Sequence, residues 1–519
     1  IDGLGIIALN VRIQVIQRSH CMENIIKYIA SRVDSIESSS KNYWIISTVI
    51  LSVIVSLILS RYPDLIFSPR FWAEEIIYLE TFFHANSQLD GFDRMVYPSY
   101  YNLLSRVAGF FASLVELEFA PIVTTFIGFL ILMTPIIIIF MTDCSYWSKL
   151  KDKIILSLFL IFSCSTGEIW LNSTNLHFIF PVTSFLILLD DNLSSKVKRF
   201  FYSLLIGVGS LTGPITLLMS PFFLLRYWHT RNKQFAVYCA ILLVFGLLHV
   251  SYYLVAKDLG MMVSNRLGAN TGSSEQIAHI FSNNIIFPVF GYFLSIVFRT
   301  IADILNSGID GVSSYLEYLG YYFPEILIEY IKSTFVFIHD ANVVIYAIFF
   351  LSFFMFIYYQ FKRASLDSKL FFILPFFYLS IVMSLLSLKG VGGFRYSYIT
   401  GFILLFYLYN QLSFVKTEYG KRYLRYILMF SIIIGMLEYY PRMISYTSNN
   451  WPIWKEEVGL WRVDDSYNPR IWPSIKKSNG LWPERMSIWY IDLNKPRYWD
   501  QYGNRRFSTE VERYFVDKN

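Results

Sequence analysis

Four side chains able to bind or move charge lie close together early in the chain, within residues 68–78. They are Arg70, Trp72 and the adjacent acids Glu74 and Glu75. A pair of carboxylates beside a membrane is costly to keep near lipid, so it favours a functional explanation. Burial and a like charge raise the pKa of a carboxyl group toward neutral pH, where it serves as a general base. The alternative is a solvated helix start, at which the helix dipole favours acidic residues.

A second group of polar side chains lies within residues 167–177. It offers the acid Glu168, the amides of Asn172 and Asn175, and the imidazole of His177. These groups together suit a polyhydroxylated ligand such as a sugar. Taken alone, the segment is more typical of polar loop chemistry, with Asn175 capping a helix.

A third motif, in residues 389–396, carries the cations Lys389 and Arg395 with three glycines between them and Tyr396 at its end. Glycine lets the backbone approach a ligand closely, and Lys and Arg suit phosphate. We therefore expect a bound phosphate at the membrane rim. The alternative is snorkelling of the cations to lipid headgroups, but snorkelling does not require glycines. A fourth motif, Leu-Thr-Gly-Pro at 211–214, is more typical of a structural helix break.

Composition places these motifs in a membrane protein. The 519 residues are 55% hydrophobic and 16% charged, whereas soluble domains are roughly 25% charged. Mean hydropathy is +0.45, and several uncharged runs approach the roughly 20 residues of a transmembrane helix. We expect an all-α polytopic protein with about 10–12 membrane-embedded helices, some short or broken. The four cysteines show no paired spacing, which indicates neither a disulfide framework nor a zinc site.

The expected spans fall into a full-length and a short class. The full-length runs are 42–60, 119–141, 235–256, 341–361, 370–388, 396–414 and 423–440. The short runs are 154–164, 176–189 and 200–225, the last with Gly213-Pro214 at its centre. Short and Gly/Pro-broken runs suggest helices that end inside the protein, where their ends line a cavity.

The membrane domain is expected to span residues 42–440, after a cytoplasmic lead-in at 1–41. Within it, 61–118 and 257–340 are expected to form outward loops or surface helices. The tail 441–519 holds seven of the twelve tryptophans. We expect the tail to form a small irregular appendage outside the membrane, packed over the mouth of the cavity.

The Lys and Arg residues predict the orientation. Five loop clusters fall on one side when the spans alternate and 200–225 counts as a hairpin, and the positive-inside rule assigns that side to the cytoplasm. The N-terminus is then cytoplasmic, while the acidic motif and the C-terminus are extracytoplasmic. These loops also explain the net charge of +6 without nucleic acid as a partner.

Together the motifs resemble those of a bacterial group within the GT-C superfamily of membrane glycosyltransferases. The matching stretches are Trp72-Ala-Glu-Glu75, Gly167-Glu168 with Asn172 and Asn175, Leu211–Pro214, and Gly392-Gly-Phe-Arg-Tyr396. The group has a Trp-Ala-Glu-Asp-Gly motif, so here Glu75 stands in place of Asp and Ile76 in place of Gly. That departure leaves open which acid is the base.

The resemblance implies an enzyme of the bacterial inner (cytoplasmic) membrane that transfers a hexose from a polyprenyl-phosphate donor. The acceptor would be a cell-envelope glycan or lipid on the outer face, attacked by direct displacement with inversion. The implied roles are the general base for Glu74 or Glu75; contacts to the donor phosphate for Arg70, Lys389, Arg395 and Tyr396; and contacts to sugars for Trp72, Glu168, Asn172, Asn175 and His177. Aromatic residues of the tail could stack on a glycan acceptor. No metal or other cofactor is required, although an acidic pair could bind a divalent ion, as in some relatives.

Two other functions remain open. An O-antigen polymerase or ligase also handles lipid-linked glycans, but it would be expected to carry a large cation-rich external loop, and 257–340 is not notably basic. A lipid-linked glycan transporter or flippase is the non-enzymatic alternative. It should show two halves of related hydropathy and charges at mid-membrane. The chain shows neither an internal repeat nor such charges.

Overall fold

The computed structural model describes residues 40–72, 74–83, 91–92, 100–142, 144–163, 167–258, 280–292, 294–295, 362, 364–386, 394–439, 453–464 and 466–471. These residues form helices and turns without a β-strand. Several predicted features lie outside the described residues: the lead-in 1–39, the span 341–361, Lys389 with its glycines, most of 257–340 and the tail beyond 471.

Within the described residues, four helical stretches are long and apolar enough to cross a membrane. They are Tyr43–Ser60, Leu117–Met141, Lys233–Val255 and Leu366–Met383. The first three lie in α2 (Ser40–Ser60), α7 (Ala120–Met141, preceded by the 3-10 turn Leu117–Phe119) and α12 (Lys233–Asp258). The fourth combines α18 (Leu366–Ser368), a π-helical turn (Lys369–Ile373) and part of α19 (Leu374–Leu386). The chain is a helical membrane protein, as its composition predicts.

The short runs form short or interrupted helices. The run 154–164 lies in α8 (Leu150–Leu158) and a π-helical turn (Phe159–Ser163), and 176–189 lies in a 3-10 turn (Thr174–Phe178) and α9 (Phe180–Leu189). The run 200–225 breaks at Gly213, where α10 (Lys196–Thr212) gives way to a 3-10 turn (Pro214–Met219) and α11 (Ser220–Thr230). Proline lacks an N–H and cannot continue the ladder of α10, so the break follows from the sequence.

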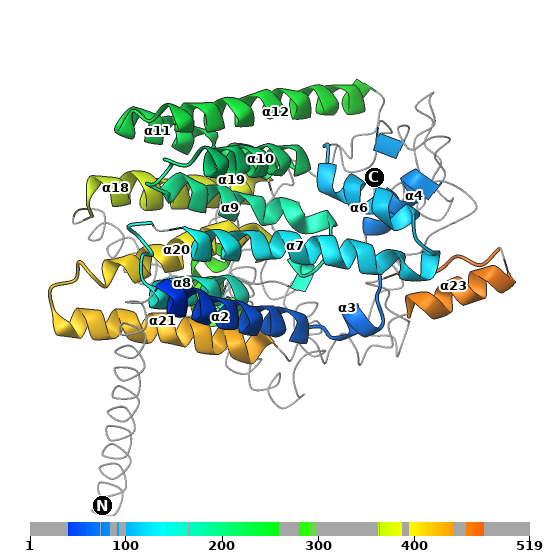
Figure 1. The fold of residues 1–519 in the computed structure, drawn as a ribbon, viewed down its shortest axis with the longest axis horizontal. Coiled ribbons are helices and arrows are strands. Elements are labelled where there is room, and N and C mark those ends of the chain that lie inside the picture. The colour runs from blue at the N-terminus through cyan, green and yellow to red at the C-terminus, as the bar shows by residue number, and fades with distance from the viewer. Residues whose placement is uncertain are drawn as a thin grey trace, which may run out of the picture.

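The helices lie side by side with their long axes in similar directions (Figure 1). At the right of the view lie α3 (Asp64–Phe67), α4 (Glu75–Phe83), α6 (Leu103–Ser113) and α23 (Trp454–Val463). We call this the motif end. The turn between α11 and α12 and the beginnings of α18 and α21 (Glu418–Tyr439), which lie near predicted Lys and Arg clusters, are at the left. The two ends are separated as alternating spans require, and which end faces the cytoplasm stays a prediction.

The core surrounds two enclosed helices. Every residue of α9 is buried, and so are nearly all residues of α20 (Tyr398–Gln411). α20 packs against α9, α19 and α21, and against three π-helical turns, Phe159–Ser163, Ser282–Ile286 and Lys369–Ile373. The backbone of α20 continues from the turn Phe394–Ser397, so the core holds the segment that carries Arg395.

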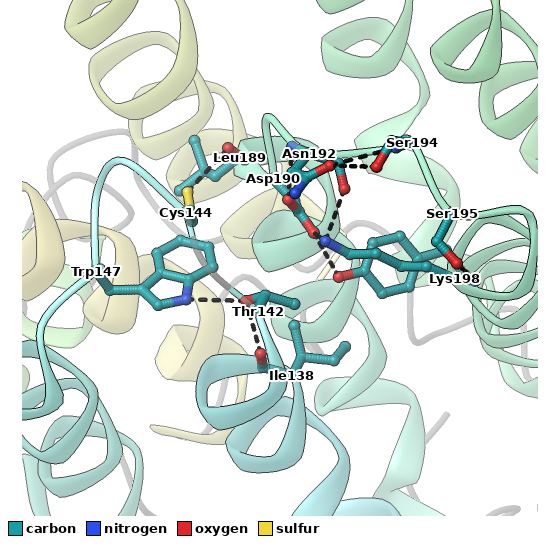
Figure 2. A network of polar contacts seen from close by, with 11 residues as sticks. Ile138, Thr142, Cys144, Trp147, Leu189, Asp190, Asn192, Ser194, Ser195 and Lys198 are labelled. Atoms are coloured by element: carbon teal, nitrogen blue, oxygen red, sulfur yellow. Dashed lines mark hydrogen bonds and ion pairs between the residues drawn. The ribbon is translucent and has the colours of Figure 1, made fainter. Parts of the chain in front are cut away.

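A network of polar contacts joins the ends of α7 and α9 to the start of α10 (Figure 2). Asp190 is fully buried; it accepts hydrogen bonds from Tyr202 Oη at 2.6 Å and from Asn192 N–H at 2.9 Å, and its Oδ2 lies 2.5 Å from Lys198 Nζ. Cys144 Sγ donates to Leu189 O at 3.2 Å. A buried charge needs a partner of opposite sign and further hydrogen bonds, and Asp190 has both.

The described part of the tail is a short helix docked at the motif end. In α23, Trp454 is buried, its ring lies 5.0 Å from that of Phe71, and its Nε1–H donates to Leu117 O at 2.7 Å. Arg462 pairs with Glu118 at 2.9 Å. α23 is therefore fixed to Phe71 and to the turn Leu117–Phe119 before α7, and the Trp454 ring is not available to stack on a glycan.

Candidate functional site

Glu75 is buried at the first residue of α4, and both of its carboxylate oxygens accept hydrogen bonds. Oε2 accepts from Trp72 N–H at 2.7 Å, and Oε1 accepts from Ser173 N–H at 2.5 Å and from Ser173 Oγ at 2.9 Å. Arg70 Nη1 lies 3.8 Å from Oε2. Burial raises the pKa of Glu75, while Arg70 and the hydrogen bonds oppose that rise. Glu75 thus ties the start of α4 to the loop at Ser173.

Glu74, directly before Glu75, is in a different environment. It is partly exposed, and within the described residues its carboxylate has no hydrogen bond or ion pair. Tyr78, Tyr100 and Arg395 lie within electrostatic range of it. Of the two acids in the motif, Glu74 is the one whose oxygens are open to a ligand.

Arg70 and Trp72 are buried beside Glu75. The Arg70 guanidinium lies 5.2 Å from the centre of the Trp72 ring, which is 8% exposed. The motif therefore holds Glu75 through the Arg70 guanidinium and the Trp72 backbone N–H, while the Trp72 ring packs against Arg70. The predicted roles of Arg70 at a phosphate and of Trp72 at a sugar gain no support from this placement.

The loop before α9 is held by its own amides. Asn172 Nδ2 and Asn175 Nδ2 each donate to Glu168 O at 2.6 Å, and Asn172 Oδ1 accepts from Asn175 N–H at 3.0 Å. Both asparagines are buried. The amides thus shape the loop: the N-cap residue of the turn Thr174–Phe178 is Ser173, which makes no side-chain cap hydrogen bond, and Asn172 Oδ1 accepts from the Asn175 N–H inside that turn. Their predicted contact with a sugar is not reflected in this arrangement.

The same loop is strained and tightly packed. Leu171 is fully buried with φ of 49°, a left-handed conformation that costs a non-glycine residue about 1–3 kcal/mol. A Cβ on Gly128 of α7 would lie 2.7 Å from Asn172 N. From α6, Ser105 Oγ donates to Ser173 O at 2.9 Å. Contacts from α4, α6 and α7 therefore fix the loop, and strained backbone of this kind is typical of functional sites.

Glu168 and Arg395 meet in an ion pair although they are far apart in the sequence. Arg395 Nη1 lies 3.0 Å from Glu168 Oε2, and the side chains are 25% and 44% exposed, so the pair is accessible to a ligand. Burial lowers the pKa of Arg395, but Glu168 and other neighbours more than compensate, so its net shift is upward and it stays charged. Tyr396 packs beside it, with its ring centre 5.1 Å from that of Phe178. Lys389 lies outside the described residues.

His177 lies on the buried side of this ion pair. Its Nδ1 is 3.0 Å from Thr174 O, and its ring centre is 5.7 Å from that of Tyr100. Gly213, at the helix break, makes room for it, because a Cβ there would lie 2.6 Å from His177 Cβ. The Leu-Thr-Gly-Pro motif is structural, as expected, and it also shapes the back of the site.

The structure thus brings together Glu74, Glu168, Arg395 and His177 at the motif end, and it adds Tyr100, which the sequence analysis did not identify. Tyr100 lies in a tyrosine-rich stretch with no glycine motif and no charged residue within five positions, so no local signal distinguishes it. Within the described residues, no group of three His, Cys, Asp or Glu side chains is placed to hold a metal ion. The arrangement offers an open carboxylate, a cation and a phenol hydroxyl.

No family model, no curated protein and no solved structure matches this chain. The chemistry of the site has to be inferred from its own residues.

Proposed function

We propose that the protein is a membrane glycosyltransferase that uses a sugar carried on a polyprenyl phosphate and works at the motif end. The observation that carries this proposal is the ion pair between Glu168 and Arg395, 3.0 Å apart and partly exposed, with the open carboxylate of Glu74 in electrostatic range of Arg395. A cation for a leaving phosphate and a free base for an incoming hydroxyl are the two groups that glycosyl transfer from a lipid phosphate needs.

The donor phosphate would take the place of Glu168 on Arg395. Arg is suited to this exchange because its planar guanidinium binds a phosphate through two parallel hydrogen bonds. Glu168, released from the ion pair, would then accept hydrogen bonds from hydroxyls of the transferred sugar. The site thus keeps its cation neutralised until the donor arrives.

In the transfer step, the acceptor hydroxyl oxygen attacks the anomeric carbon while the bond from that carbon to the phosphate oxygen breaks. The hydroxyl proton passes to Glu74, and the lipid phosphate leaves with the bonding electron pair, neutralised by Arg395. Attack from the side opposite the phosphate inverts the configuration. Glu75 is less suited to this role, because its oxygens already accept from Trp72 and Ser173.

The acceptor proposed is a cell-envelope glycan or lipid on the outer face of a bacterial cytoplasmic membrane. Two features support that side: the Lys and Arg distribution, and the separation of the motif end from the turns near the predicted Lys and Arg clusters. A donor anchored in the bilayer would enter laterally, so its phosphate would arrive at the level of the helix ends where Arg395 lies.

The test uses the full chain in lipid nanodiscs with synthetic polyprenyl-phosphate hexoses and a cell-envelope glycan fraction. Release of lipid phosphate and transfer of labelled sugar are measured for the wild type, Glu74→Gln, Arg395→Ala and Glu168→Gln. Loss of a general base lowers turnover by about a hundredfold or more, so Glu74→Gln should be the least active variant at saturating donor. Arg395→Ala should both weaken donor binding and slow transfer.

Matched controls lie on α23 at the same end of the molecule. Glu456→Gln removes an exposed acid, and Arg462→Ala removes a cation that is 56% exposed and paired with Glu118. Both should retain the activity of the wild type. Absence of donor consumption by the wild type, or full activity of Glu74→Gln and Arg395→Ala, would overturn the proposal.

A further inference from the structure

Tyr100 packs among side chains of the site and lies within electrostatic range of both Glu74 and Arg395. Its ring centre lies 5.7 Å from that of His177 and 6.5 Å from that of His249 on α12. A Cβ on Gly213 would lie 3.6 Å from Tyr100 Cε2, so the helix break leaves room for the phenol ring. These three contacts fix the ring, and the hydroxyl follows from it because a tyrosine has only two side-chain torsions to set.

The Tyr100 hydroxyl has no hydrogen-bond partner within the described residues, and the side chain keeps some accessible surface. The carboxylate of Glu74 and the guanidinium of Arg395 are both within electrostatic range of it. Tyrosine hydroxyls that are largely enclosed usually have a partner, since leaving such a donor unpaired is costly. An unpaired donor beside a cation is a suitable contact for an anion.

Burial raises the pKa of Tyr100 well above its usual value, and the neighbours Tyr78, Tyr396 and Glu74 act in the same direction, although Arg395 opposes them. The hydroxyl therefore keeps its proton at neutral pH. A protonated phenol donates a hydrogen bond, and it does not compete with Glu74 as a base.

We propose that Tyr100 is a further substrate-contacting residue, whose hydroxyl donates a hydrogen bond to a phosphate oxygen of the lipid-linked donor beside Arg395. This inference rests on the proposed function, because it takes a lipid phosphate as the ligand. Arg395 supplies the charge, and Tyr100 sets the direction of the phosphate, so that the breaking bond faces the acceptor side at Glu74. As the phosphate gains charge during transfer, the hydrogen bond from Tyr100 strengthens with it.

The test measures binding of geranylgeranyl phosphate, which carries no sugar, to the full chain in nanodiscs by titration calorimetry. Tyr100→Phe removes only the oxygen and keeps the ring that packs against His177. A hydrogen bond to a charged group is worth enough that its loss should weaken binding by about tenfold. Phosphorus NMR of the bound lipid should show a shifted resonance in Tyr100→Phe, which a purely structural role of the ring would not produce.

The neighbouring Tyr101 provides the matched control. Its ring lies 4.6 Å from the Arg106 guanidinium and 6.0 Å from the ring of Tyr252. Tyr101→Phe should bind the lipid phosphate as the wild type does.

The outcomes separate the two proposals. If the wild type does not bind the lipid phosphate, the phosphate site itself is refuted, and the proposed function fails with it. The role of Tyr100 is refuted, and the proposed function stands, if three results are obtained together: the wild type binds the lipid phosphate, Arg395→Ala weakens that binding, and Tyr100→Phe binds as the wild type does. A defect of Tyr100→Phe that appears only with sugar-bearing donor would place Tyr100 at the sugar and would also overturn the inference.

Discussion

Substitution by glutamine should lower the stability of the protein at Glu75 but not at the adjacent Glu74. In Glu75→Gln, an amide NH₂ replaces one oxygen of a carboxylate that accepts from Trp72 N–H, Ser173 N–H and Ser173 Oγ. At least one buried donor loses its acceptor, at a cost of about 1–3 kcal/mol. Arg70, 3.8 Å away, loses a counter-charge in a buried setting, for which about 3–5 kcal/mol is typical. Because Arg70 also contacts the Trp72 ring, we expect a total near the lower end of the two costs together, about 4 kcal/mol.

Glu74→Gln should leave stability unchanged, because the Glu74 carboxylate makes no hydrogen bond or ion pair within the described residues. The assay is thermal unfolding of both variants in the same detergent, followed by the loss of the monodisperse peak in size-exclusion chromatography. Glu75→Gln should unfold several degrees below the wild type, whereas Glu74→Gln should unfold at the same temperature as the wild type.

Two results would refute this reasoning. Equal stability of Glu75→Gln and the wild type would mean that Glu75 carries a proton in the native protein, since a protonated carboxyl and an amide are nearly interchangeable. Burial favours that state, whereas Arg70 and the donors oppose it. Destabilisation by Glu74→Gln would mean that its carboxylate has a partner in the folded state, and its suitability as a base would then be lost.

Three further predictions concern the helix break at Gly213, the acid Glu457 in α23 and the buried Asp190. Gly213→Ala should lower sugar transfer severalfold, because the added Cβ would lie 2.6 Å from His177 Cβ. Gly207→Ala is the control in the same activity assay, because the atom nearest to its added Cβ is a side-chain carbon at 3.3 Å. Burial raises the pKa of Glu457, but hydrogen bonds from its arginine and tyrosine partners outweigh burial and lower the pKa below 4.5. Glu457 therefore stabilises α23 above pH 4.5, and this stabilisation is lost as the pH falls through the folded-state pKa. Tryptophan fluorescence measured against pH should show the change, and Glu457→Gln should diminish it. Asp190→Asn should destabilise the protein by about 1–3 kcal/mol in thermal unfolding, since it removes the counter-charge of the partly exposed Lys198 and leaves one oxygen in place of two to accept from Tyr202 and Asn192.

The spans could be predicted from the sequence because length and apolarity are local properties. The predicted runs 42–60, 119–141 and 235–256 agree with α2, α7 and α12 to within a few residues. The predicted apolar run at 200 begins later than α10 itself, because the first turn of the helix carries lysine and arginine and is therefore not part of an apolar run. That turn is helical because Ser195 Oγ accepts from Lys198 N–H and caps it.

The site was predictable as a set of segments but not as a set of contacts. The motifs indicate that the segments near residues 74, 168 and 395 carry chemistry, and the ion pair of Glu168 with Arg395 brings two of them together. Whether Glu74 or Glu75 is open depends on the position of Ser173, about a hundred residues away in sequence, which no local pattern encodes. The inward turn of the Asn172 and Asn175 amides likewise depends on how the loop closes on Glu168 O.

The enclosure of α20 has a consequence for biogenesis. This helix is synthesised late, yet the elements that surround it, among them α9, α19 and the π-helical turn Phe159–Ser163, come earlier in the chain. A helix that leaves the translocon into lipid must then pack against helices that are already present, and α21, which follows it in the chain, completes its surroundings. Insertion of α20 carries Arg395 into place next to Glu168, so the ion pair forms only near the end of assembly. Nascent chains that stop before residue 394 therefore lack Arg395, so the phosphate site that we propose would be absent until α20 is made.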